Sequence, residues 1–290
     1  MLIQLIGSTF RVSTPLVFAM LGGLASERAG VVNLALEGMM LFGALGAAVG
    51  TLATHSPWLG ALCGLGSGVL LAAVYGLVVL RWRANQVVAG MGINMLALGL
   101  TPEFCKMLYD QTGRTPAIPL AEHFQAAPMY GAWIGVALAW FVLRFTRPGL
   151  WLGFAGEHPG ALDAAGISVT RVRWLAVLAS GALAGLGGAA LSTFSSSFFS
   201  RDMAGGRGYM ALAALIFGKW RPLPAALACL LFGFTDALQD RLQGVVVWGR
   251  EPIPVQFIQI LPYVVTILVL AGFVGQSRAP KALGVPFERD

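Results

Sequence analysis

Acidic and amide side chains border some of the most apolar stretches of this 290-residue chain. Asn33 and Glu37 are four residues apart in SERAGVVNLALEGMM (26–40), so on a helix they would share one face. A charge at the bilayer centre costs at least ~2.5–3.5 kcal/mol, and an acid there therefore faces a cavity or a partner. Glu37 could cap a helix that begins near Gly38, pair with Arg28, or contact or gate a substrate, and the sequence leaves these roles open.

Further polar side chains inside apolar stretches extend this candidate translocation path. Asn94 and Asp236 each interrupt an apolar stretch, and the run STFSSS (192–197) ends another. Its hydroxyls could contact a polar substrate, although Ser and Thr also bond back to their own helix. Three aromatic residues in and after this run could stack on a flat substrate ring or face lipid: Phe194, Phe198 and Phe199. The candidate path residues are Asn33, Glu37, Asn94, Ser192, Thr193, Ser195 and Ser196.

Sequence motifs of enzymes are missing. There is no GxxxxGK[ST] phosphate loop, so the chain is not expected to hydrolyse ATP by that route. His55, His123 and His158, its only histidines, fall in predicted loops, which argues against a Ser–His protease or a histidine-ligated metal site inside the membrane. We therefore expect no catalytic residue, metal ion or cofactor on this chain.

Composition places these residues in a membrane protein. The chain is 57% hydrophobic and 11% charged, and long apolar runs recur from end to end. This predicts an all-α integral membrane protein, a bundle of about eight or nine transmembrane helices in a single domain, 1–290. The expected spans are 12–25, 38–54, 58–80, 86–101, 128–145, 174–200, 208–218, 222–238 and 254–275. Spans 12–25, 86–101 and 208–218 fall short of the ~20 residues of a straight crossing, which predicts broken or half-helices.

Glycines mark expected packing faces and one expected hinge. Small residues four apart let helix backbones approach closely in lipid, where no hydrophobic force drives helices together. Such spacings occur at Gly46/Gly50, Gly60/Gly64/Gly68 and Gly181/Gly185. Gly205, Gly206 and Gly208 precede only about ten apolar residues, and Pro222 follows them. These four residues predict the two ends of a half-helix, with a short tilted helix of no special role as the alternative.

Basic residues predict the orientation. If the C-terminal tail, 276–290, is cytoplasmic, twelve of the 19 Lys and Arg residues fall in cytoplasmic loops or in the tail, as the positive-inside rule requires. This distribution accounts for the net charge of +6, so no nucleic-acid partner is implied.

The loop GEHPGALDAAGISVTRVRW (156–174) carries the most informative local pattern. Pro159 suits the first position of a helix and Gly166 the residue just past its end, which predicts a two-turn helix over 159–165. This helix could be a plain connector or a docking element that enters a partner. As a docking element it would present a small apolar surface with charged residues at its rim. The surface residues would be Ala161, Leu162, Ala164 and Ala165, and the rim residues Glu157, Arg171 and Arg173.

Four blocks together resemble the membrane permease subunit of bacterial ABC importers of the branched-chain amino acid/simple sugar superfamily. The closer likeness is to the nucleoside (basic membrane lipoprotein-dependent) branch. The blocks are LGGLASERAGVVNLALEGMMLFGALGA (21–47), GEHPGALDAAGISVTRVR (156–173), GGRGYMALAALIFGKWRP (205–222) and LPYVVTILVLAGFVGQSRAPKALGVPFERD (261–290). They are spread over essentially the whole chain, and only His158 and Asp163 depart slightly from the pattern.

The resemblance implies that 156–173 is a coupling segment, which seats in a cleft of an ATP-binding subunit that holds ATP-Mg. It also implies a second, longer permease as the partner in a heterodimer, with a homodimer as the alternative, and a periplasmic or lipid-anchored substrate-binding protein. The resemblance further implies that the chain is embedded in the lipid of the bacterial inner membrane. The implied function is uptake of a nucleoside or related ribosyl compound. A simple sugar or a vitamin is the alternative substrate, and an ion-coupled secondary transporter is the alternative mechanism.

Overall fold

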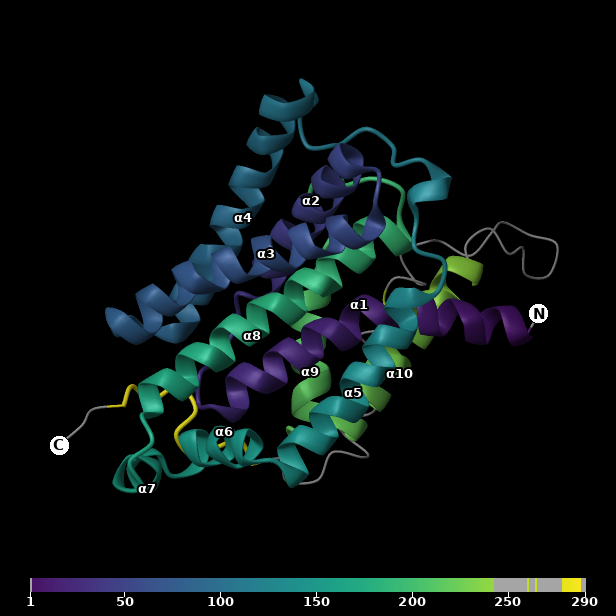
Figure 1. Ribbon diagram of the computed structural model, residues 1–290. Coiled ribbons are helices and arrows are strands. Elements are labelled where there is room, and N and C mark those ends of the chain that lie inside the picture. Colours follow the sequence, from purple (N-terminus) through teal and green to yellow (C-terminus); the bar gives the residue numbers. More distant parts are fainter. Residues whose placement is uncertain (1, 243–259, 261–263, 265–277, 288–290) are drawn as a thin grey trace.

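The computed structural model of the protein describes residues 2–242, 260, 264 and 278–287 (Figure 1). In this part of the chain, helices are joined by loops, and one isolated bridge pairs Arg114 with Ser200. The helices are α1 (Leu2–Arg28), α2 (Leu36–Thr54), α3 (Pro57–Gly76), α4 (Gln86–Tyr109), α5 (Ala127–Phe145), α6 (Arg147–Glu157), α7 (Pro159–Ala164), α8 (Val169–Ala190), α9 (Arg207–Phe217) and α10 (Pro222–Leu242). Short turns of helix are η1 (Leu77–Arg81), which extends α3, η2 (Leu120–Glu122), and η3 (Leu191–Ser195), which extends α8.

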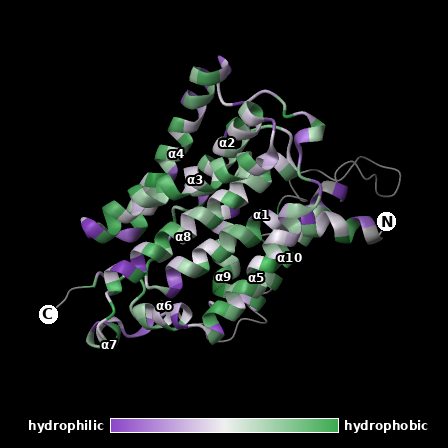
Figure 2. Ribbon diagram, viewed as in Figure 1, coloured by the Kyte–Doolittle hydropathy of each residue, from purple (hydrophilic) through white to green (hydrophobic). Residues whose placement is uncertain are grey.

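Seven of the described helices are long and apolar enough to cross a membrane, namely α1 to α5, α8 and α10. Figure 2 shows that most residues of these helices are hydrophobic, with hydrophilic residues gathered near helix ends. The predicted all-α membrane fold is therefore confirmed. The expected span 254–275 lies outside the described residues apart from residues 260 and 264.

Two spans that were expected to be short are continuous. α1 has 27 residues and runs through Pro15, and α4 has 24 residues and runs through Pro102. The predictions of broken helices at 12–25 and 86–101 are therefore wrong. A proline inside a membrane helix need not end it, because neighbouring helices and side chains can satisfy the freed backbone groups. α9, in contrast, has only 11 residues.

α2, α3 and α8 pack against one another through glycine. A Cβ placed on Gly43 would lie 2.5 Å from the Cα of Gly185, and one on Gly64 would lie 2.8 Å from the carbonyl oxygen of Gly43. A Cβ on Gly68 would overlap the carbonyl oxygen of Gly181. These backbones touch directly, which confirms the glycine packing faces predicted from the sequence. We call these three helices the glycine-packed layer.

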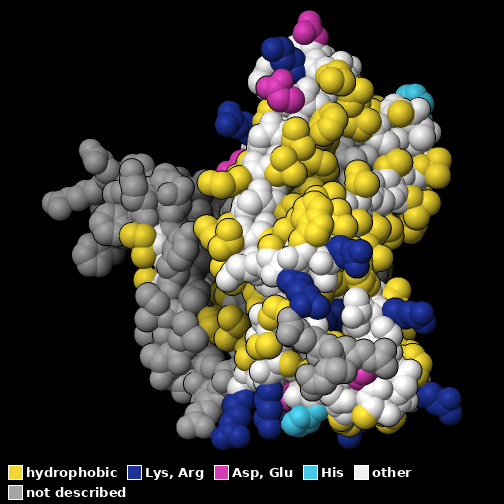
Figure 3. All heavy atoms as spheres, turned by 90° about the vertical axis from the view of Figure 1, so that its left-hand side faces the viewer, with side chains coloured by type: hydrophobic (Ala, Val, Ile, Leu, Met, Phe, Trp, Pro, Cys, Tyr) yellow, Lys and Arg dark blue, Asp and Glu magenta, His cyan; other side chains and the backbone are white. Residues whose placement is uncertain are grey.

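α1 lies between α8 on one side and α5 and α10 on the other, while α9 contacts α1, α2 and α10 (Figure 1). At one end of the bundle, α6 and α7 connect α5 to α8 (Figure 1). α6 occupies residues that were expected to form a loop. Thr146 starts it by accepting the N–H of Gly149 at 3.4 Å, with a proline in the first turn. Lys and Arg side chains gather towards this end on the face shown in Figure 3.

Candidate functional site

An irregular segment, residues 29–35, joins α1 to α2 inside the bundle, and most of it is buried. Buried backbone outside a helix needs hydrogen-bond partners, most of all in a membrane. Side chains from later helices supply them. The Tyr75 hydroxyl of α3 donates to the carbonyl of Val32, and the Gln86 side chain of α4 accepts the N–H of Val32 at 2.7 Å. The segment is therefore held by polar side chains rather than by its own helical bonds.

Asn33 belongs to this segment and not to α2, so its expected shared helical face with Glu37 is wrong. Its Oδ1 accepts the N–H of Ala35 at 3.1 Å, a local bond that competes with helix formation. Its Nδ2 donates to the hydroxyl of Ser180 on α8 at 2.8 Å. Asn33 thus ties the segment to the glycine-packed layer.

Glu37 lies in the first turn of α2, yet its carboxylate reaches the beginning of α9. Oε1 accepts the N–H of Gly206 at 2.7 Å, and Oε2 accepts the N–H of Gly208 at 2.6 Å. These N–H groups lack intrahelical partners, and the positive end of the helix dipole favours an anion there. Glu37 is 5% exposed, and its carboxylate caps α9. It neither caps its own helix nor pairs with Arg28, the two structural roles that the sequence left open. We call this contact the Glu37 clamp.

The beginning of α9 is shaped for this carboxylate. Gly205 and Gly206 have φ of 53° and 84°, a backbone conformation that favours glycine. A Cβ on Gly208 would lie 2.5 Å from the backbone nitrogen of Glu37 and 2.8 Å from its Oε2, so only glycine fits.

α9 also ends abruptly. Phe217 is its last residue, and Trp220, with φ of 54°, lies in the turn before α10 begins at Pro222. The Trp220 Nε1 donates to Glu27 Oε2 of α1 at 2.6 Å, which fastens this turn. The helix is therefore broken on both sides of α9 within 205–224, as the sequence suggested. A hinge role for Gly205, Gly206, Gly208 and Pro222 stays a prediction.

Asn94 of α4 also bonds residues near the beginnings of α2 and α9. It lies about 12 Å along its helix from Gln86. Its Oδ1 accepts the N–H of Gly38 at 2.8 Å. Its Nδ2 donates to the carbonyl of Leu34 at 2.8 Å and to the hydroxyl of Tyr209 at 2.7 Å. Asn33, Glu37 and Asn94, three of the predicted path residues, therefore gather where α2 and α9 begin. We call them, with Ser180 and Tyr209, the polar cluster.

The hydroxyl run lies elsewhere. Ser192 and Thr193 are buried, and both hydroxyls bond back to the carbonyl of Ala189, at 3.5 and 2.6 Å. Twelve residues, about 18 Å of helix, separate Ser192 from Ser180 in the polar cluster. Ser195 ends η3 and is exposed, and Ser196 and Ser197 lie beyond the helix. The span expected at 174–200 therefore ends earlier than predicted, and it also begins earlier, at Val169. The predicted path residues therefore fall into two separate groups.

The aromatic residues of that run already have partners. The Arg11 guanidinium lies 5.0 Å from the ring centre of Phe194, and that of Arg114 lies 4.0 Å from Phe198. Phe199 is buried, and its carbonyl accepts the N–H of Thr115 at 3.1 Å. Residues 115–124 and 193–199 pair in this way across the end of the bundle opposite α7.

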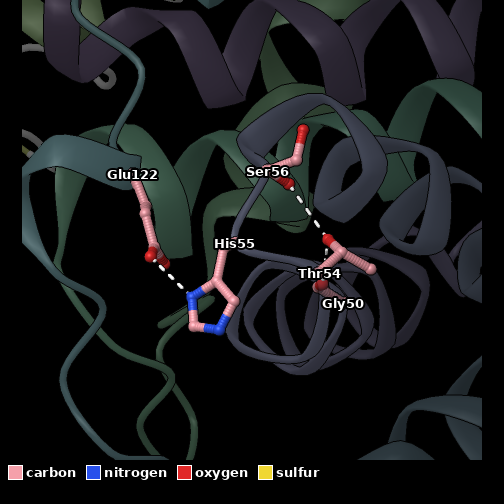
Figure 4. A network of polar contacts seen from close by, with 5 residues as sticks. All are labelled: Gly50, Thr54, His55, Ser56 and Glu122. Atoms are coloured by element: carbon pink, nitrogen blue, oxygen red, sulfur yellow. Dashed lines mark hydrogen bonds and ion pairs between the residues drawn. The ribbon is translucent and has the colours of Figure 1, made fainter.

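An exposed ion pair between His55 and Glu122 lies at this opposite end (Figure 4). His55 Nδ1 lies 2.7 Å from Glu122 Oε1, with the histidine side chain 76% exposed. Next to it, in the last turn of α2, the Thr54 hydroxyl donates to the carbonyl of Gly50 at 2.7 Å. Among the described residues, no three His, Cys, Asp or Glu side chains come together in a way that could hold a metal ion.

The predicted coupling segment contains the expected short helix, α7, which begins at Pro159 and ends at Ala164. Gly166 has φ of 80°, as expected for the residue past a helix end. The side chains of Ala161, Ala164 and Ala165 are exposed. Beside α7, a cavity of about 270 Å³ is lined by Arg83, Asp163, Gly166, Ser168, Val169, Thr170 and Phe287.

Two residues of this segment do not lie where the sequence suggested. Leu162 is 4% exposed and packs inward against Ala155 and Val169, so it is not part of an outward docking surface. Arg173 is 2% exposed and cannot make contacts at a rim. The reason is that α8 begins at Val169, which puts Arg173 on a buried face of its first turns. Arg171 is exposed, and Glu157 Oε2 accepts the N–H of Lys281 at 3.5 Å.

Comparisons with known proteins show which family the chain belongs to. Residues 5–270 match the family described as the permease component of the branched-chain amino acid transport system. The chain belongs to this permease family. It is 37% identical to the guanosine ABC transporter permease protein NupQ of Bacillus subtilis, over 98% of this chain and 96% of that protein. It is 39% identical to the nucleoside ABC transporter permease protein NupC of Lactococcus lactis, over 95% and 93%. A third relative is TsgC13 of Haloferax volcanii, which is provisionally named a glucose ABC transporter permease protein. The two are 35% identical over 97% of this chain and 94% of that protein.

Sequence reasoning missed several residues that hold this permease together. Tyr75, Gln86, Ser180, Tyr209 and Trp220 each bond the 29–35 segment, Asn94 or Glu27. All five are polar or amphipathic side chains in or beside apolar helices, and this was the only signal that could have found them. Tyr75 and Gln86 satisfy backbone groups of the irregular 29–35 segment. Ser180, Tyr209 and Trp220 instead pair with the buried side chains of Asn33, Asn94 and Glu27.

Proposed function

We propose that this permease subunit works in an ABC importer, and that partner subunits bind and hydrolyse ATP-Mg to drive uptake of a nucleoside or related ribosyl compound. The main support is the nearly full-length likeness to permeases named for guanosine and for nucleosides. The relative named for glucose keeps a simple sugar as the second candidate substrate. This chain itself then carries no catalytic residue and no cofactor.

The coupling proposal rests on the exposure of α7. Ala161, Ala164 and Ala165 leave a small apolar surface that a cleft in an ATP-binding subunit can accept. Closure of two such subunits around ATP would shift α7, and transport requires that the membrane helices follow this shift. Arg171 and Glu157 are the charged residues that would contact the edge of the cleft.

The partners and the place follow from the same proposal. The chain would pair with a second, longer permease, or with a copy of itself, and would receive substrate from a periplasmic or lipid-anchored binding protein. The seven membrane-length helices among its described residues make it a multi-pass membrane protein. We propose that it lies in the bacterial inner membrane with its C-terminus in the cytoplasm. The basic residues gathered at the α7 end support that orientation (Figure 3).

Uptake into proteoliposomes tests the function. The chain is purified with its co-expressed partner subunits, reconstituted, and supplied with binding protein, ATP inside the vesicles, and labelled guanosine or glucose. We expect ATP-dependent guanosine uptake that unlabelled nucleosides compete and glucose does not. Preferential uptake of glucose would overturn the nucleoside assignment. Uptake by the isolated chain under an ion gradient, without any ATP-binding subunit, would overturn the ABC mechanism.

Substitutions on α7 test the coupling surface. Ala164→Trp and Ala165→Trp place a large side chain at exposed positions, so the fold should tolerate them while docking should not. Gly166→Val puts a β-branched side chain at positive φ. We expect ATP-driven uptake to fall at least tenfold in all three variants, with normal amounts of protein in the membrane. Leu138→Trp, an exposed apolar position on α5, is the matched control. Normal uptake in all three α7 variants would leave 156–173 as an ordinary connector.

A further inference from the structure

The C-terminal residues 278–287, which we call the strap, lie against three other segments at the α7 end of the bundle (Figure 1). The N–H of Ala282 donates to the carbonyl of Gly156, the next-to-last residue of α6, at 2.8 Å. The N–H of Gly284 donates to the carbonyl of Gly30, in the segment that leads to α2, at 3.1 Å. The strap is therefore bonded to α6 and to the 29–35 segment at the same time.

Arg173 fastens the strap, α6 and the 29–35 segment to one another from the inside. Its Nε donates to the carbonyl of Ala29 at 3.1 Å, its Nη1 to Val285 at 2.8 Å, and its Nη2 to Ala155 at 3.3 Å. One planar guanidinium thus joins the 29–35 segment, the strap and α6 to α8. Arginine suits this position because its donors are fixed in one plane, whereas a lysine ammonium cannot match several separated carbonyls as well.

The strap also contacts the coupling helix. Phe287 packs against a small apolar cluster made by Leu162 of α7, Ala155 of α6 and Val169 of α8. This cluster is separate from the main core of the bundle. α7 is therefore connected to the rest of the permease through this cluster and through the backbone bonds that the strap and Arg173 make.

Arg173 also lies at one end of a continuous series of contacts. From the carbonyls of Ala29 and Gly30, the 29–35 segment leads directly to Asn33 and Glu37. Glu37 in turn holds the first residues of α9. A displacement of α6 and α7 that moves the strap must therefore move or strain this segment, unless the Arg173 bonds break.

We propose that Arg173 and the strap form a positioning joint, which sets α7 relative to the 29–35 segment and so transmits movement of α7 to the Glu37 clamp. The inference rests on the proposed role of α7 in coupling. Arg173 is a positioning residue, because it acts through the backbone of other segments and not on a substrate. Coupling between distant sites requires a rigid connection of this kind, with two arrangements that the partner can bias.

The test uses the reconstituted complex and measures ATP hydrolysed per guanosine imported. Arg173→Met keeps an unbranched apolar stem and removes every donor, Arg173→Lys keeps the charge, and Gly284→Val strains the strap at φ of 80°. Lys281→Ala is the matched control in the strap, because its exposed side chain is lost while its backbone is retained. We expect Arg173→Met and Gly284→Val still to hydrolyse ATP. Each should need roughly 5–150-fold more ATP per guanosine imported, the factor that corresponds to typical coupling free energies.

Arg173→Lys should fall between the wild type and Arg173→Met, and Lys281→Ala should match the wild type. A purely structural tie would lower the amount of assembled complex and leave the ratio of ATP to guanosine unchanged. An unchanged ratio in Arg173→Met and Gly284→Val therefore overturns the joint. If Arg173→Met does not assemble, Gly284→Val and Arg173→Lys decide by the same ratio.

Hydrogen exchange gives a second readout that does not depend on the substrate. In the wild-type complex, the amides of Ala282 and Gly284 should be protected, and Arg173→Met should lose this protection while amides inside α3 keep theirs. Retained protection would show that Arg173 does not position the strap. If the wild-type complex shows no ATP-driven guanosine uptake, the proposed function fails, and the exchange experiment still decides whether the joint exists.

Discussion

The glycine-packed layer and α9 are held in place by opposite means. In α2, α3 and α8, backbones touch at Gly43, Gly64 and Gly185, so the attachment is spread over many small contacts. α9 is an 11-residue helix whose beginning is held by one carboxylate, Glu37, and by the Asn94–Tyr209 bond. Contacts of the first kind are lost only when the helices separate. Those of the second kind can be released one at a time.

This difference indicates which part can move. Close packing transmits force and resists rearrangement, because any shift brings backbone atoms into conflict. One face of α9 also packs in the core, but the beginning of this short helix is oriented by a few hydrogen bonds, so it can tilt if those bonds exchange partners. We therefore expect the glycine-packed layer to act as a fixed frame and α9 to move against it during transport. The following substitutions test the two halves of that comparison.

The largest effect should come from filling the glycine-packed layer. In Gly68→Leu, the new side chain meets the backbone of Gly181 and Gly185, which neither side can relieve. Overpacking usually costs ~1–3 kcal/mol and more where backbone must move, so we expect the folded protein to be lost. Gly66→Leu, on the same helix with nothing within 4 Å of its Cβ, is the control and should purify normally. Size-exclusion profiles in detergent compare the two, and equal behaviour would mean that the layer is not closely packed.

Removing the Glu37 clamp should cost less stability and more function. Glu37→Gln cannot accept from both Gly206 and Gly208, because its amide nitrogen is a donor. The loss of one charge-assisted bond from a buried site predicts a destabilisation of about 2 kcal/mol. We expect a lower melting temperature and at least tenfold slower ATP-driven uptake. Glu103→Gln, an exposed acid on α4, is the control. A variant with normal uptake would show that the clamp does not control α9.

A smaller effect is expected from the second attachment of α9. Tyr209→Phe removes the hydroxyl that accepts from Asn94 Nδ2, a neutral bond worth about 1 kcal/mol. The remaining bonds of Asn94, to Gly38 and Leu34, keep the side chain in place. Uptake rates should change two- to threefold, and melting temperature only slightly. Tyr130→Phe on the exposed face of α5 should change neither. A larger loss than that of Glu37→Gln would reverse the order of importance proposed for the two attachments.

The smallest effect is expected outside both regions. His55→Ala removes the exposed ion pair with Glu122, and such pairs contribute about 0–1 kcal/mol. We expect a change in stability of about 0.5 kcal/mol or less and unaltered uptake. A melting temperature that falls as far as in Glu37→Gln would mean that the end opposite α7 also holds the frame together.

Local chemistry in the sequence was enough to predict much of the fold. The all-α membrane class, the glycine faces, the short α9 and the start of α7 at Pro159 all depend on neighbours within one or two turns of helix. The same local reasoning failed at α1 and α4. It interpreted the short spans 12–25 and 86–101 as broken helices, although the chain continues as helix beyond them and through Pro15 and Pro102.

The site could be predicted only in part, because its partners are distant in the sequence. Glu37 stood out as an acid beside an apolar span, but its partner Gly206 lies 169 residues away, and nothing local points to it. Arg173 was predicted to make charged contacts at the rim of a docking surface, because its three carbonyl partners come from segments that only the fold brings together. Polar residue type marks such positions, and only tertiary structure assigns their partners.

The irregular 29–35 segment also has a consequence for how the permease is made. Ala29 and the arginine that bonds its carbonyl are 144 residues apart. At a ribosomal rate of ~5–20 residues per second, roughly 7–30 s pass before that side chain is even synthesised. During this interval the carbonyl of Ala29 lacks the side chain that satisfies it, although Tyr75 and Gln86 can already bond Val32. Biogenesis should therefore depend on insertion machinery that shelters α1 and α2 until α8 emerges, and ribosome pausing before α8 should expose the nascent chain to membrane proteases.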